Sequence, residues 1–151
     1  MRRHALLTAL LFASLCAAAC GDRRLRAEAR SFLAVYEGLD HRQKSAQREK
    51  KLTDLRLLVL VEPEVVQARD HCVAGHTALL RAERAQEEAA RKLDTALAGS
   101  TDGAPLGEQT TQEIRTQIEE ADGALNDARS SLRQCETQAR GLSLRFGESG
   151  H

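Results

Sequence analysis

A repeating spacing of apolar residues in the second half of the chain most constrains its fold. Between Ile114 and Leu142, apolar or small residues recur at alternating intervals of four and three. They are Ile114, Ile118, Ala121, Leu125, Ala128, Leu132, Cys135, Ala139 and Leu142. In an α-helix this spacing makes one continuous stripe, which is typical of a coiled-coil seam. We therefore predict a helix over about 108–142 that packs along its length against another helix.

The same rhythm occurs on the other side of a cluster of helix-breaking residues. Its positions, with Gln86 as the one polar interruption, are Ala68, Cys72, Gly75, Leu79, Ala82, Gln86, Ala89, Leu93 and Ala96. The segment 99–107 between the two stripes contains three glycines and Pro105, which favour a turn. The segments at about 63–98 and 108–142 are therefore predicted to form an antiparallel coiled-coil hairpin.

Two cysteines indicate the register of this hairpin. Cys72 and Cys135 both lie on the seam, and the midpoint of their numbers, 103.5, falls within the predicted turn. Residues whose numbers sum to 207 should then face each other, so that Gly75 faces Leu132. Small residues recur opposite large ones along the seam, which allows close approach without voids. Packing and the two sulfurs give the same register, and this agreement predicts a Cys72–Cys135 disulfide.

The segment 24–60, which precedes the hairpin, is also predicted to be helical. Four-and-three spacing relates the apolar residues Leu25, Ala29, Phe32, Tyr36 and Leu39. We interpret the polar stretch 41–51 as a solvated part of the same helix. Pro63 predicts a break, because proline disfavours helix in the residue before it, although a kinked helix that continues past Pro63 is the alternative. The chain is thus predicted to be all-α, as an up-down-up three-helix bundle in which 24–60 covers the hairpin.

Composition and motifs bear on the classes of function. Lys and Arg number 22, as do Asp and Glu, so no basic excess favours nucleic acid as a partner. The sequence has no Gly-rich phosphate loop, nucleophile elbow or His-Glu-x-x-His helix. Acidic pairs such as Glu119-Glu120 fall on helix faces predicted to be solvated, without the pocket that acid–base catalysis needs. We therefore do not expect an enzyme, and no residue is assigned a catalytic role.

Residues 1–19 have the organisation of a secretory signal peptide. A positive start at Arg2 and Arg3 is followed by an apolar core over 5–15 and by small residues before Cys20. The apolar core is too short to span a bilayer as a helix. After removal of 1–19, the expected parts are a lipid-anchored N-terminus, a helical domain and a frayed tail, at 20–23, 24–142 and 143–151.

The sequence Leu15-Cys16-Ala17-Ala18-Ala19-Cys20 resembles the lipobox of bacterial lipoproteins, in which the final cysteine receives diacylglycerol. The resemblance covers only the leader and departs from the usual pattern at Ala17, where Leu is typical. Ala17 and Ala19 also suit the ordinary signal peptidase, which would leave Cys20 unmodified. Cysteine number favours lipidation, because a free Cys20 would be an odd thiol in an exported protein. With Cys20 acylated, the two remaining thiols are the pair that the hairpin aligns.

The resemblance implies a lipid-anchored protein of the bacterial cell envelope. Acyl chains such as palmitate on Cys20 would be its covalent lipid, and no cofactor is expected. Gly21 stands where inner-membrane lipoproteins carry Asp, which implies the outer membrane facing the periplasm, although Asp22 follows. The expected partners are the membrane and an unidentified envelope protein or cell-wall component, with no nucleic acid. The helical domain carries no motif that assigns it to a family.

A metal site is the alternative to the disulfide. Cys72 and His76 are four residues apart on one helix face, and Cys135 approaches from the facing helix. Two thiolates and one imidazole are three of the four ligands of a structural zinc site, and His71 could be the fourth only with helix distortion. An exported protein meets an oxidising compartment, which favours the disulfide. We therefore predict a disulfide-stapled structural or interaction module, with metal binding through Cys72, His76, Cys135 and His71 as the alternative.

Overall fold

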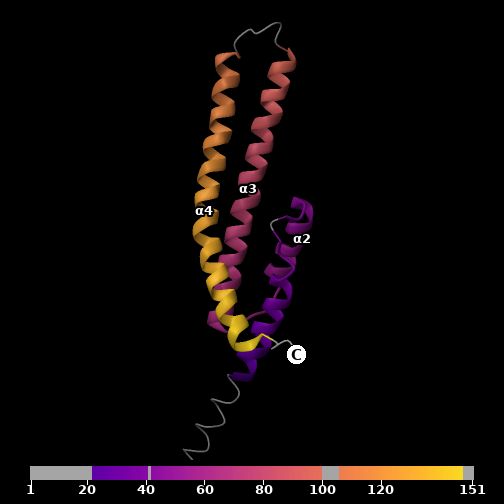
Figure 1. Cartoon of the computed structure of the whole chain (residues 1–151), viewed down its shortest axis with the longest axis vertical. Helices are drawn as coiled ribbons and strands as arrows, with labels where there is room; N and C mark the ends of the chain where they lie inside the picture. Colours follow the sequence, from indigo (N-terminus) through magenta and orange to yellow (C-terminus); the bar gives the residue numbers. More distant parts are fainter. Residues whose placement is uncertain (1–21, 41, 100–105, 148–151) are drawn as a thin grey trace, which may run out of the picture.

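The structure is a computed structural model that describes residues 22–40, 42–99 and 106–147. Most of these residues are helical. Residues 22–36 are helical, and three labelled helices follow them, α2 (Ser45–Arg56), α3 (Pro63–Gly99) and α4 (Glu108–Phe146). The helices α3 and α4 lie side by side and antiparallel along the long axis of the molecule (Figure 1). The all-α class and the hairpin are therefore confirmed, with α3 and α4 beginning at the predicted residues.

The register of the hairpin agrees with the prediction at Gly75, which faces Leu132. A Cβ atom added to Gly75 would lie 2.8 Å from Cγ of Leu132 and 2.9 Å from its backbone nitrogen. Ion pairs extend the same register toward the turn, since Arg81–Asp127 and Lys92–Glu113 are each 2.9 Å apart. The residue numbers of both pairs sum to within two of 207. α3 and α4 therefore approach so closely at Gly75 that only glycine fits there.

The segment 24–60, expected to be one helix, consists of two helices that double back on each other. The helix over 22–36 closes in a turn in which the backbone nitrogens of Gly38 and Leu39 donate to the carbonyls of Val35 and Tyr36. The chain remains non-helical at Asp40, whose Oδ1 accepts a hydrogen bond of 2.8 Å from the backbone nitrogen of Arg42. We call residues 22–56 the N-terminal arm.

The two halves of the N-terminal arm pack on the hairpin in opposite directions. In α2, Ser45 contacts Glu83 and Arg56 contacts Thr77, so α2 runs antiparallel to α3. In the first half, Arg30 donates from Nε to the carbonyl of Phe146, the last residue of α4. An up-down pair of short helices therefore takes the place of the single long helix expected in an up-down-up bundle.

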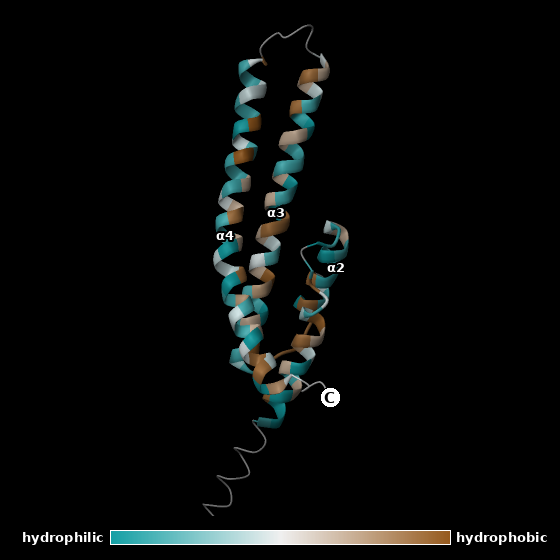
Figure 2. Cartoon of the chain, viewed as in Figure 1, coloured by the Kyte–Doolittle hydropathy of each residue, from teal (hydrophilic) through white to brown (hydrophobic). Residues whose placement is uncertain are grey.

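The N-terminal arm covers only the half of the hairpin that is farthest from the turn (Figure 1). The apolar core lies there, between the arm and both long helices (Figure 2). Its buried members are Ala29, Phe32, Leu33, Leu55, Val65, Ala68, Cys72, Cys135, Ala139, Leu142 and Phe146. We call this covered half the base and the half next to the turn the tip. Among the described residues no third helix packs on α3 and α4 at the tip, so the seam there lies between these two helices alone.

The last helix is longer than expected. Residues 143–146, predicted to begin a frayed tail, continue α4, and Phe146 is 9% exposed. The reason is the contact of Phe146 with the N-terminal arm, since its carbonyl accepts from Arg30 and its side chain joins the core. The predictions for residues 148–151, for the leader and for lipidation of Cys20 lie outside the described residues.

Replacing Gly75 with alanine should destabilise the protein by about 1–3 kcal/mol, because the new methyl group meets the backbone of Leu132 and the helices must separate. Gly123 is a matched control in α4, where an added Cβ would have nothing within 4 Å. Gly123→Ala should raise stability by about 0.5–1 kcal/mol through helix propensity. Urea unfolding followed by circular dichroism measures both effects. A shift of the same sign in both variants would contradict the register.

Candidate functional site

The predicted cysteine pair lies in the base of the hairpin, at the centre of the apolar core. Cys72 and Cys135 form a disulfide, with the two sulfurs 2.02 Å apart and the two Cα atoms 4.7 Å apart. Both residues are 0% exposed. The small residues on either side of them, with Gly75 one turn away, allow the two backbones to come this close. The bond links positions 63 residues apart and thus joins α3 to α4 at the end opposite their connecting turn.

The other two candidate metal ligands, His76 and His71, differ in burial and in their position relative to the disulfide. His76 is 8% exposed and lines a hollow beside Cys135, together with Tyr36 and Leu132. His71 is half-buried and does not line this hollow. Both sulfurs are bonded to each other, and within the described residues no group of three or more His, Cys, Asp or Glu side chains is placed to hold a metal ion. The disulfide arrangement therefore has structural support that the alternative zinc site lacks.

Tyr36 belongs to the wall that the N-terminal arm adds to this hollow. Its ring stacks on Phe32 with centroids 5.7 Å apart and an interplanar angle of 14°. Burial raises the pKa of Tyr36, Glu136 raises it further, and Arg140 lowers it in part. The phenol is thus protonated at neutral pH, and its role is to pack and to offer a neutral hydroxyl.

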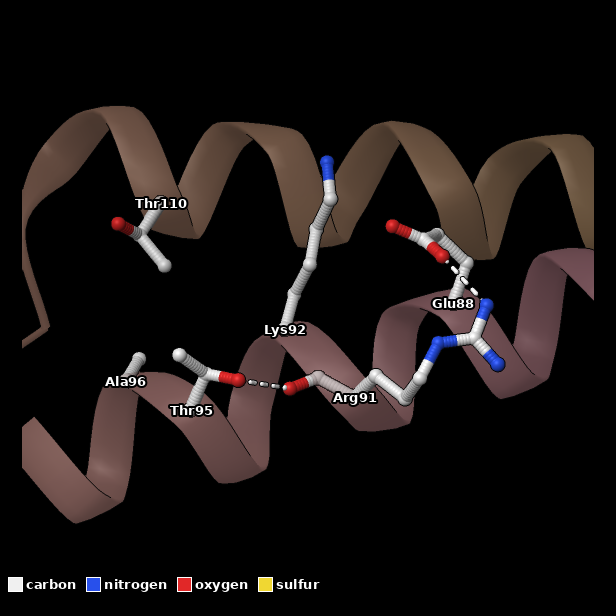
Figure 3. A pocket seen from close by; sticks show the side chains of 6 residues that line it. All are labelled: Glu88, Arg91, Lys92, Thr95, Ala96 and Thr110. Carbon is white, nitrogen blue, oxygen red and sulfur yellow. Dashed lines mark hydrogen bonds and ion pairs between the residues drawn. The ribbon is translucent and has the colours of Figure 1, made fainter.

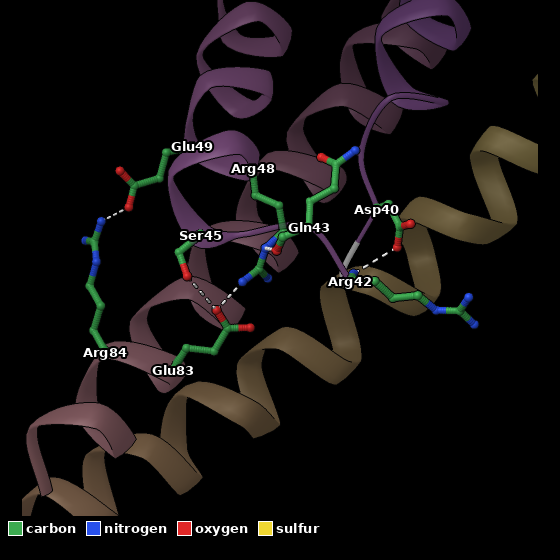
Figure 4. Close-up of polar contacts among 8 residues, drawn as sticks. All are labelled: Asp40, Arg42, Gln43, Ser45, Arg48, Glu49, Glu83 and Arg84. Atoms are coloured by element: carbon green, nitrogen blue, oxygen red, sulfur yellow. Dashed lines mark hydrogen bonds and ion pairs between the residues drawn. The ribbon is translucent and has the colours of Figure 1, made fainter. Parts of the chain in front are cut away.

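A polar cluster holds the far end of the N-terminal arm against α3 (Figure 4). Arg48 is 3% exposed, ion-paired through Nη2 with Glu83, and it donates from Nε to the carbonyl of Gln43 at 3.1 Å. Ser45 donates to the same Glu83 oxygen at 3.4 Å. A buried guanidinium needs such partners, because an unpaired one carries a large desolvation cost. This cluster fixes how far the arm reaches along α3.

The buried Arg48 differs from the prediction that the stretch 41–51 is solvated helix. One signal for it was present in the sequence. Arg48 precedes Leu52 and Leu55 by four and seven residues, which places all three on one helix face, and all three are buried. The position of Arg48 at the end of an apolar stripe therefore indicated that its side chain is buried.

A shallow groove lies between α3 and α4 at the tip (Figure 3). Its walls are formed by Glu88, Arg91, Lys92, Thr95, Ala96 and Thr110. The hydrogen bond from Arg91, 2.5 Å long, lowers the pKa of Glu88. Hydrogen bonds from Lys92 and Gln109 likewise lower the pKa of the neighbouring Glu113. Both carboxyl groups are therefore charged at neutral pH, which suits a charged contact surface and does not suit a general acid.

Another side of the tip exposes large apolar side chains. Leu93 is 38% exposed, Leu97 57% and Ile118 50%. Leu93 and Ile118 are predicted seam residues that two helices alone cannot cover. Leu93 and Leu97 are four residues apart and thus share a face of α3. The tip therefore combines an uncovered apolar strip with paired charges in the neighbouring groove.

Comparison with known proteins yields no relative, since no family model, no curated protein and no solved structure matches this chain. None of the helices in the described ranges is long and apolar enough to cross a membrane. A proposal for its function therefore rests on the surfaces of the molecule itself.

Loss of the disulfide should lower the free energy of unfolding by about 4 kcal/mol, the chain-entropy value for a loop of this length. A Cys72→Ala, Cys135→Ala double variant tests this by urea unfolding. Reductant should lower the midpoint of the native protein and leave that of the double variant unchanged. An unchanged midpoint for the native protein under complete reduction would contradict a stabilising bond.

Proposed function

We propose that the protein is a lipoprotein of the bacterial cell envelope, and that its helical hairpin is a structural or interaction module. The observation that carries the proposal is the uncovered tip, where two helices project beyond the N-terminal arm and expose Leu93, Leu97 and Ile118. Apolar residues on a helical surface with a polar rim are typical of sites that bind a partner helix or groove. The contact region of the module is thus its tip.

The anchor in this proposal is lipid on Cys20, two residues before the described helix at 22–36. Support comes from the lipobox-like leader and from the pairing of Cys72 with Cys135, which would leave Cys20 as the odd cysteine of the exported chain. A diacylglycerol together with an N-acyl chain such as palmitate would hold the protein firmly. The proposed location is the outer membrane, with the hairpin in the periplasm.

The hairpin is suited to reach a partner away from the membrane. A helix of the length of α3, which has 37 residues, spans about 55 Å at 1.5 Å per residue. The disulfide, the close contact at Gly75 and the cross-helix ion pairs keep α3 and α4 in one register from base to tip. An unidentified envelope protein or cell-wall component is the proposed partner.

The anchor is tested by the intact mass of the protein purified from Gram-negative membranes and alkylated without reduction. We expect a chain that starts at Cys20, carries three acyl chains and has gained no alkyl group. A lipid-free mass with two or three alkylated thiols would refute both the anchor and the disulfide. It would also bring back metal binding by Cys72, His76 and Cys135 as the leading function.

The contact role of the tip is tested separately, with a photo-crosslinking amino acid introduced at Leu97 in the membrane-anchored protein. The same amino acid at Thr137, an exposed position on α4 in the base, is the control. We expect one discrete crosslinked product from position 97 and none from position 137, because the uncovered apolar strip lies at the tip. Equal products from both positions, or none from position 97, would contradict a contact site at the tip.

A further inference from the structure

The connection between α2 and α3 exposes an unusual apolar edge. Residues 57–61 read Leu-Leu-Val-Leu-Val, and residues 58–61 are not helical. Their side chains alternate between the core and the outside. Leu58 and Leu60 pack against the core cluster, whereas Leu57 is 72% exposed, Val59 90% and Val61 61%. Burial of one set in the base therefore forces the other set outward, and we call the exposed set the apolar edge.

The apolar edge lies at the base, next to the start of the described chain. Glu28 accepts hydrogen bonds of 2.8 Å from the backbone nitrogens of both Val61 and Glu62. Arg24 forms an ion pair with Glu62 at 3.8 Å. The edge is thus beside the first turns of the helix at 22–36. Figure 1 shows that this end of the molecule points away from the tip, and Figure 2 shows apolar residues gathered there.

We propose that the apolar edge inserts into the interfacial region of the lipid bilayer. The proposal rests on the lipid anchor proposed above, because Cys20 is two residues before Asp22. About 9 Å of helix separates Asp22 from Glu28, which holds the edge. The edge is therefore close enough to an anchored Cys20 to reach the interface, where apolar faces insert by about 5–10 Å. An anchored Cys20 therefore brings the edge to the level of the headgroups.

The charges around the apolar edge suit a membrane surface that contains anionic lipid. Arg23, Arg24 and Arg26 are exposed on the first turns of the helix at 22–36, with Arg24 ion-paired to Glu62 and Arg26 to Asp22. Juxtamembrane arginines are attracted to anionic headgroups. A second copy of the chain is a weaker occupant, because three side chains offer much less area than a stable dimer interface buries. The bilayer thus fits both the chemistry and the position of the edge.

Insertion of the apolar edge would give the protein a second attachment to the membrane. A lipid chain alone is a flexible tether about which the hairpin can tilt freely. An edge that enters the bilayer beside the tether restricts this tilt, and it directs the tip away from the membrane. The inference therefore adds an orienting element to the proposed anchor.

Tryptophan fluorescence can test the insertion directly, because the native chain contains no Trp. The Val59→Trp variant, produced as the full chain and purified from Gram-negative membranes, is placed on vesicles of phosphatidylcholine and phosphatidylglycerol with brominated acyl chains. Leu97→Trp, at an exposed position on the tip, is the matched control. We expect a blue-shifted emission for Val59→Trp and quenching roughly twofold stronger than in the control, because the ring enters the interfacial region. Circular dichroism checks that both variants keep the native helix content.

The outcomes separate this inference from the anchor on which it rests. If neither variant floats with the vesicles, the lipid anchor fails and the inference fails with it. If both float and are quenched equally, the anchor stands and insertion of the apolar edge is overturned. A concentration-dependent blue shift of Val59→Trp without vesicles would show a second copy on the edge and would also overturn the inference.

Discussion

The close contact of α3 with α4 at the base is the interaction on which the rest of the structure depends. It combines the missing side chain of Gly75, which admits Leu132, with the disulfide one turn away. Close approach brings small residues of both helices out of water, and a seam rich in alanine buries little apolar area per residue. The covalent bond therefore compensates for a thin seam, and the N-terminal arm adds Phe32 and Leu55 to the large core residues Leu142 and Phe146 of α4.

Stability is distributed unevenly along the hairpin as a result. The base has the apolar core between the N-terminal arm and both long helices, together with the disulfide, whereas the tip relies on a two-helix seam and exposed ion pairs such as Lys92–Glu113. Surface ion pairs contribute little, typically below about 1 kcal/mol. Local opening should therefore cost least near the turn and most around Cys135. The surface proposed for binding thus lies in the region that can adjust most easily to a partner.

Much of this architecture could be predicted from the sequence, because a long seam repeats its signal many times. The four-and-three spacing gave the hairpin, and the positions of Cys72 and Cys135 gave its register. The end of the helix at Tyr36 was not predicted, since the polar stretch that follows carries no apolar period to show where a helix ends. Exposure of Ile118 was also missed, because a seam pattern shows which side chains face a partner helix and cannot show how far a third helix extends. The ion pair of Arg48 with Glu83 sets how far the N-terminal arm extends along α3, and it joins segments that are distant in the sequence.

The position of the disulfide has a consequence for the covalent integrity of the chain. The two long helices are joined twice, through the backbone between Gly99 and Glu108 and through sulfur at the base. A protease that cuts the connecting segment would leave a two-chain molecule, with α4 still bonded to the half of the chain that leads back to Cys20. Such a nick would remove the link at the tip without releasing either helix. The molecule would thus tolerate cleavage between α3 and α4 and keep both long helices.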